Sequence, residues 1–161
     1  MTKTIGVGFG LILAVLPAAG WTATATTGRV LPAALALEAA EMALSTCTAQ
    51  GFRVSVSIVD REGIQRVLIV GDGAGPVSIT TSRRKAYTSA ALGVSTGDMQ
   101  RQSNGAPPPP IDPEILALAG GLPIRAGDQV IAAIGVGGAD RSDKDEACAA
   151  AGLDKIKDRL N

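Results

Sequence analysis

The chain has 161 residues, enough for one domain, and it carries 15 basic and 15 acidic residues but no histidine. This charge balance offers no electrostatic support for generic binding of nucleic acid. The absence of histidine excludes Ser-His-Asp and Cys-His catalysis and every metal site that depends on an imidazole ligand. Any chemistry must therefore use carboxylates, Lys, Tyr, Thr, Met or backbone groups.

The first 25 residues differ in character from the rest. Lys3 precedes an uncharged apolar run from Ile5 to Leu16, and small residues alternate at Ala23–Ala25. This order is typical of a secretory signal peptide, and the run is shorter than the about 20 residues of a membrane-spanning helix. An uncleaved membrane anchor is the alternative. We expect cleavage near Ala25, a domain over residues 26–161, and a periplasmic or secreted location.

The first half of the mature chain predicts a helix, a hairpin and a second helix. Apolar residues recur at helical spacing within Arg29–Gln50. Phe52–Asp60 alternates apolar and polar residues, which predicts a half-buried strand, and Ile64–Val70 follows as its hairpin partner. Val77–Leu92 then returns to helical character.

The second half predicts a loop, another hairpin and a terminal helix. Gly97–Pro113 is polar and contains four consecutive prolines, Pro107–Pro110, so we expect neither a helix nor a central strand there. Leu122–Arg125 and Gln129–Val136 predict a hairpin, and Asp140–Leu160 predicts the last helix. This order of elements favours an α+β fold, an antiparallel sheet with helices packed on it.

Cys47 and Cys148 are the only cysteines. In an oxidising compartment an even number of cysteines favours a disulfide, which would close a loop of about 100 residues. Two buried free thiols on Ala-rich helix faces are the alternative.

Three adjacent cations, Arg83, Arg84 and Lys85, fall within the second predicted helix. Neighbours on a helix are about 100° apart, so the three cannot share one face. At least one must point toward the sheet or an interface, where it needs a carboxylate of the fold or an anionic ligand. A solvated helix face is the alternative.

The motifs of the C-terminal third are the most specific in the chain. They are Gly120–Ile124 (GGLPI), Val130–Ala139 (VIAAIGVGGA), Asp145-Glu146 and Ala151–Leu153 (AGL). With Val56–Asp60, Gly63 and Lys85-Ala86 upstream, the chain resembles the GlcG/HbpS-type haem-binding family from about Leu31 to Leu160. It departs from the family pattern at Gly137, usually serine, at Ala132, usually glycine, and at Leu92, often aromatic.

The resemblance implies a profilin-like antiparallel sheet of about five strands, with N- and C-terminal helices packed on it. It also implies homo-oligomers from dimers to octamers, and binding of haem or a related tetrapyrrole by a carrier or by an accessory of a sensor protein. Haem here would bind without a histidine ligand, and no separate metal-ion site is expected. The candidate ligand-binding residues are Arg83, Arg84 and Lys85 for the propionates, and Thr88, Thr96 and Met99 for the iron.

Two further functions are alternatives to a non-catalytic haem-binding protein. One is an enzyme acting on a small carboxylate or on haem, with Lys85 as cationic anchor and Asp60 as acid or base. The other is a structural or sensory partner protein that docks through the stiff Pro107–Pro110 segment.

Overall fold

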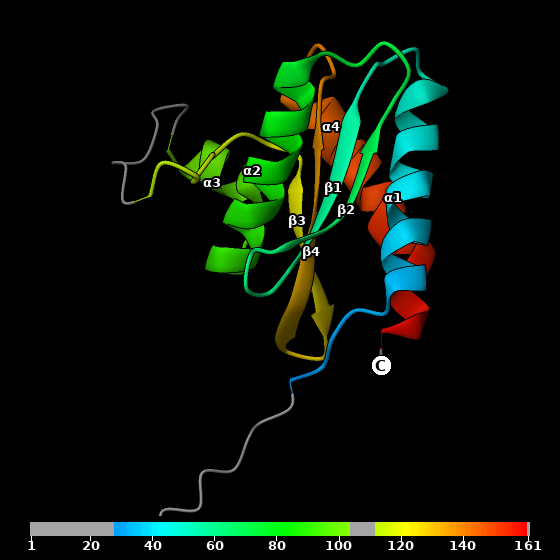
Figure 1. Ribbon diagram of the computed structural model, residues 1–161. Coiled ribbons are helices and arrows are strands. Elements are labelled where there is room, and N and C mark those ends of the chain that lie inside the picture. The colour runs from blue at the N-terminus through cyan, green and yellow to red at the C-terminus, as the bar shows by residue number, and fades with distance from the viewer. Residues whose placement is uncertain (1–27, 104–111, 161) are drawn as a thin grey trace, which may run out of the picture.

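The computed structural model describes residues 28–103 and 112–160, which form a sheet between two layers of helices (Figure 1). In chain order the elements are α1 (Ala33–Thr48), β1 (Ser55–Asp60), β2 (Gln65–Val70), α2 (Pro76–Leu92), α3 (Thr96–Gln102), β3 (Gly121–Ala126), β4 (Gln129–Gly137) and α4 (Ser142–Ile156), with a short 3-10 turn over Lys157–Arg159. No helix in these residues is long and apolar enough to cross a membrane.

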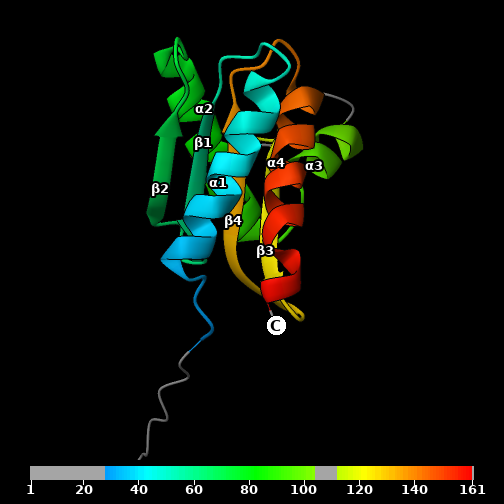
Figure 2. The same cartoon turned by 90° about the vertical axis from the view of Figure 1, so that its right-hand side faces the viewer.

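The sheet is antiparallel with strand order β2-β1-β4-β3. Helices α1 and α4 lie side by side on one face, and α2 covers the other (Figures 1 and 2). The predicted α+β class is therefore confirmed, with four strands in the described residues rather than about five. Because β1 and β4 are central, the core is built mainly on these two strands.

Strand β1 is buried on both faces, whereas its alternating pattern predicted one solvated face. The serines of that second face bond to serines of α2: Ser55 Oγ lies 2.7 Å from Ser78 Oγ, and Ser57 Oγ lies 3.0 Å from Ser82 Oγ. Paired hydroxyls satisfy one another, so a polar strand face can be buried under a helix. The prediction was wrong because it equated polar with solvated.

The described residues include a helix, α3, that the sequence analysis did not expect. Ser95 caps it, since its hydroxyl accepts hydrogen bonds from the backbone N–H groups of Gly97 and Asp98. The helix ends at Gln102, before the prolines that led us to exclude a helix from the whole segment. Pro107–Pro110 and the predicted signal peptide lie outside the described residues.

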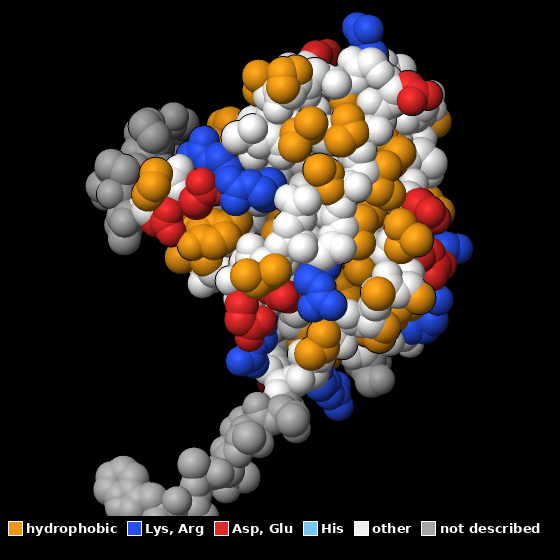
Figure 3. Space-filling model, viewed as in Figure 1, with side chains coloured by type: hydrophobic (Ala, Val, Ile, Leu, Met, Phe, Trp, Pro, Cys, Tyr) orange, Lys and Arg blue, Asp and Glu red, His pale blue; other side chains and the backbone are white. Residues whose placement is uncertain are grey.

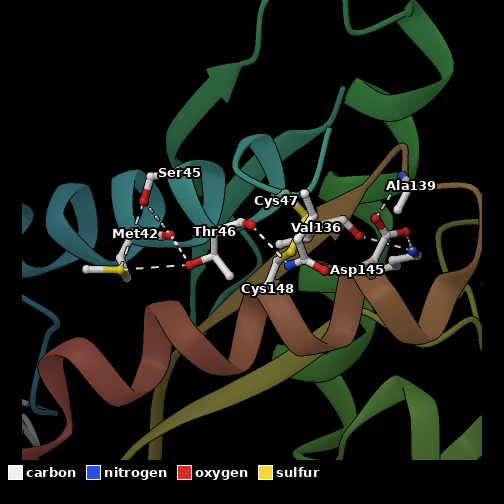
Figure 4. Close-up of a disulfide and its surroundings, with 10 residues drawn as sticks. Met42, Ser45, Thr46, Cys47, Val136, Ala139, Asp145 and Cys148 are labelled. Carbon is white, nitrogen blue, oxygen red and sulfur yellow. Dashed lines mark hydrogen bonds and ion pairs between the residues drawn. A yellow bond between two sulfur atoms is a disulfide. The ribbon is translucent and has the colours of Figure 1, made fainter. Parts of the chain in front are cut away.

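Cys47 of α1 and Cys148 of α4 form a disulfide, as predicted, and both are fully buried (Figure 4). The bond joins the two helices that cover the same face of the sheet. Asp145 precedes Cys148 by about one turn on α4, and both face the interior (Figure 4).

Helix α2 lies unusually close to β4 because glycines on the strand leave room for it. A Cβ atom at Gly135 would collide with the carbonyl oxygen of Ser82, and one at Gly137 would collide with Thr81 Oγ1. Helix α2 itself begins with proline at its first turn and ends at Gly93, whose φ of 67° forms a left-handed cap.

We expect Gly135→Ala to lower the free energy of unfolding by about 1–3 kcal/mol, because the added methyl group must push α2 away from β4. The matched control is Gly75→Ala, since a Cβ atom there meets nothing within 4 Å and its φ is −82°. Urea denaturation measures both variants. Equal stability of the two would contradict this account of the packing.

Candidate functional site

Two of the three adjacent cations bind the segment Pro113–Ile115 to α2. Arg83 pairs with Glu114, and Arg84 donates to the carbonyl oxygens of Pro113 at 2.7 Å and Ile115 at 3.0 Å. Both side chains are therefore engaged within the chain rather than free for a ligand.

The third cation, Lys85, is buried with 2% of its surface exposed. Its Nζ donates to Asp145 Oδ2 at 2.7 Å and to the carbonyl oxygen of Val136 at 3.0 Å. Asp145 Oδ1 accepts from the backbone N–H of Ala139 at 3.0 Å. Because α2 and α4 lie on opposite faces of the sheet, this ion pair joins the two helical layers at the end of β4.

Burial and pairing shift the pKa values of Lys85 and Asp145 in opposite directions. Burial lowers the pKa of Lys85, and the attraction to Asp145 offsets part of that change. Burial likewise raises the pKa of Asp145, and Lys85 opposes it. Each charge therefore depends on the other to remain in the interior.

The ion pair lies in the wall of a groove of about 440 Å³, which we call the Lys85 groove. Its lining combines the buried pair, three hydroxyl side chains, two exposed apolar side chains and one arginine, with backbone of two loops: Arg53, Gly75, Val77, Ser78, Thr81, Lys85, Leu118, Gly138, Ala139, Ser142 and Asp145. Val77 is 72% exposed and Leu118 is 40% exposed, so apolar surface borders a polar interior.

The segments that carry the family resemblance meet at this groove. A Cβ atom on Gly120, in the GGLPI segment, would lie 3.0 Å from Lys85 Nζ. Val136 and Gly138, in the second motif, supply the carbonyl acceptor and part of the lining. Asp145 belongs to the third motif. The fold therefore brings three separate motifs to one place.

The other predicted site residues lie elsewhere. The hydroxyl of Thr88 donates to the carbonyl of Arg84 and accepts from the N–H of Leu116, each at 2.8 Å. Thr96 Oγ1 accepts from the N–H of Gly121 at 2.8 Å, and both threonines are fully buried. Met99 is half-buried on α3, and none of the three lines the groove. Their roles as ligands stay predictions.

Arg53, Ser78, Thr81 and Ser142 also line the groove, and none of them was among the predicted site residues. Arg53 lies within the predicted strand Phe52–Asp60, but in the structure it precedes β1 and lines the groove. No sequence pattern marked these residues, because they come together only when the two helical layers and the end of β4 are assembled.

Asp60, paired with Lys85 in the enzyme alternative, lies toward the opposite end of the sheet. It is opposite Ala132 in the β1–β4 register, whereas the Lys85 acceptor Val136 is opposite Val56. Four residues of strand separate these positions, about 13 Å. Asp60 instead accepts from the N–H groups of the hairpin turn. The described residues contain no group of three or more acidic or cysteine side chains that could hold a metal ion.

The α+β fold and this groove define a small domain with a partly polar groove at the end of its central strand β4. The family model described as "Haem degrading protein HbpS-like" matches residues 31–154, and the chain belongs to this family. No curated protein sequence gives a significant match.

Solved structures agree with the assignment. The crystal structure of HbpS is 38% identical, with a TM-score of 0.75 over 80% of this chain and 92% of that one. A double mutant of Streptomyces reticuli HbpS is 37% identical, with a TM-score of 0.77 over 88% of this chain and 97% of that one. A PduOC:Heme complex, at 19% identity and a TM-score of 0.67 over 80% of this chain and 96% of that one, shares the fold.

We expect Asp145→Asn to destabilise the fold by about 3–5 kcal/mol at neutral pH, because it leaves the Lys85 ammonium buried without its counter-charge. The pKa of Lys85, already lowered, must fall further. Between that pKa and 10.5 the unfolded chain binds a proton that the folded chain releases, so the variant's stability must rise with pH.

Urea denaturation at about pH 7 and about pH 9 tests both parts of this expectation. The control is Asp143→Asn, which removes an exposed partner of Arg141 on the same helix and should change stability little. An Asp145→Asn protein as stable as wild type at neutral pH would contradict the role of the pair.

Proposed function

We propose that this protein is an exported haem- or tetrapyrrole-binding protein that acts as a carrier or as an accessory of a sensor, and that the Lys85 groove is its binding site. Family membership supports haem-related chemistry. The observation that carries the assignment to the groove is the position of exposed Val77 and Leu118 beside a polar interior and an arginine. This combination suits a flat apolar ring system that carries carboxylate side chains.

The lining residues fit two chemical needs of haem, an apolar surface for the macrocycle and a cation for the propionates. Val77 and Leu118 would contact the macrocycle, and Arg53 would bind a carboxylate. The hydroxyl groups of Ser78, Thr81 and Ser142 also line the groove, and each is hydrogen-bonded within the chain. Bound haem would supply an iron centre, while the Lys85–Asp145 pair would fix the shape of the groove.

A carrier or sensor accessory is favoured over an enzyme by the state of the buried titratable groups. Lys85 and Asp145 are bonded to each other, so neither is poised to exchange a proton with a ligand. Asp60, the other proposed participant, is engaged in its own turn.

Haemin added to the purified protein should give a saturable, shifted Soret band. Val77→Asp should raise the Kd by about tenfold or more, because it replaces apolar contact area with a charge. Val30→Asp is the control, since Val30 is 62% exposed and lines a cavity with Asp60 rather than the groove. Equal haemin affinity of the two variants would argue against this site.

Export is supported by the signal-like N-terminal sequence and agrees with the disulfide, since disulfides persist in oxidising compartments. We expect the protein recovered from a secreting host to begin at Thr26, and its intact mass to be that of residues 26–161 with one disulfide. Retention of residues 1–25 in the membrane fraction would show an uncleaved anchor instead.

We also propose that the protein forms homo-oligomers. Hydrophobic side chains gather over α2 and the edge strand β2 (Figure 3), where Leu68, Val70 and Val77 are exposed. Apolar patches of this kind favour association, and an edge strand has unpaired backbone groups. Sedimentation velocity would reveal the assembly, and a monomer at micromolar concentration would count against it.

A further inference from the structure

Arg53 is the cation of the Lys85 groove that has no hydrogen bond or ion pair from its guanidinium within residues 28–103 and 112–160. We propose that Arg53 is the carboxylate anchor of the binding site and sets its preference for ligands that carry a free propionate-type arm. The inference rests on the proposed function, because it names the residue that recognises the ligand's anionic group.

The cations that the sequence suggested for this task are all engaged. Arg83 is paired with Glu114, and Arg84 is bonded to backbone carbonyls. Lys85 is neutralised by Asp145 at 2.7 Å. A ligand carboxylate that displaced any of them would leave a carboxylate or carbonyl groups without their partner.

Arg53 lies just before β1, where the chain is held by burial of the next residue. It directly precedes Val54, which is fully buried, so its backbone is fixed at the entrance to β1. Its side-chain stem lies over Gly73, where a Cβ atom would come within 2.8 Å of Arg53 Cδ. Because Gly73 has a φ of 74°, the loop turns tightly beneath the arginine. The stem is thus supported while the residue stays exposed.

Arg53 borders two hollows of the surface. It lines the Lys85 groove and also a neighbouring hollow of about 610 Å³. The apolar residues of that hollow include Leu44, Phe52 and Ile69. Glu41 and Asp72 also line it, and neither pairs with Arg53. A guanidinium between the two hollows can bind a carboxylate in a bidentate manner from either hollow.

The charges of the groove favour an anion. Lys85 and Asp145 cancel, and the remaining lining residues besides Arg53 are uncharged. The groove therefore has a net charge of about +1 from Arg53 alone. An amphipathic ligand would place its apolar part against Val77 or Leu118 and its carboxylate on Arg53.

The test compares haemin with haemin dimethyl ester, in which both propionates are uncharged, on wild type, Arg53→Ala, Arg53→Lys and Arg29→Ala. Arg29 is an exposed arginine beside Asp60 and serves as the control. Arg53→Ala should weaken haemin binding by about tenfold, and Arg53→Lys should recover part of the loss, because lysine keeps the charge but not the planar fork. The ester should bind wild type and Arg53→Ala equally.

The outcomes test the Arg53 assignment and the proposed haem binding separately. If wild type binds haemin and Arg53→Ala binds it equally well, or loses haemin and ester affinity alike, the assignment of Arg53 is wrong and haem binding stands. If wild type binds neither compound, the proposed function fails and the assignment fails with it. Loss of haemin affinity in Arg29→Ala of the same size would place the carboxylate contact at the other end of the sheet.

Discussion

The ion pair between Lys85 and Asp145 is the interaction on which the arrangement of this domain depends. It joins α2 to α4 around the end of β4, and these helices lie on opposite faces of the sheet. A buried pair adds little net stability against well-packed apolar residues, but loss of one partner is costly. The pair is therefore best understood as a positional constraint: it aligns the two layers, and the groove forms beside it.

That constraint requires small residues around it. Lysine reaches Asp145 because α2 lies close to β4, and it lies close because Gly135 and Gly137 carry no side chain. Paired serines and a small apolar cluster of Val59, Ala86, Ala90 and Ala133 share this interface, and the serine hydroxyls satisfy one another. The disulfide acts on the opposite face, where it holds α4 against α1 about one turn from Asp145. The ion pair with α2 and the disulfide with α1 thus both fix the N-terminal part of α4.

Parts of the fold and site that depend on local pattern could be predicted from the sequence. Helical spacing gave α1, α2 and α4, the alternating runs gave two hairpins, and the parity of cysteines favoured Cys47–Cys148. Lys85 was singled out because three adjacent cations cannot share a helix face. Its partner was not identified, since nothing in the sequence connects Lys85 with Asp145, 60 positions further along the chain. Arg53 gave no signal in the sequence, because its position beside the groove depends on segments that are distant in the chain.

The sequence by itself determined the class of fold, the family and the exclusion of histidine chemistry, since these follow from periodicity, ordered motifs and composition. Only the tertiary structure decided which cation is buried, which are bonded to the chain, and which one borders the groove. It also decided that the serine face of β1 is covered. The physical reason is that hydrogen-bond partners and burial depend on elements distant in sequence, here residues 23 to 60 positions apart. A local pattern indicates that a side chain is polar, but the packing of the layers determines which group forms its hydrogen bond.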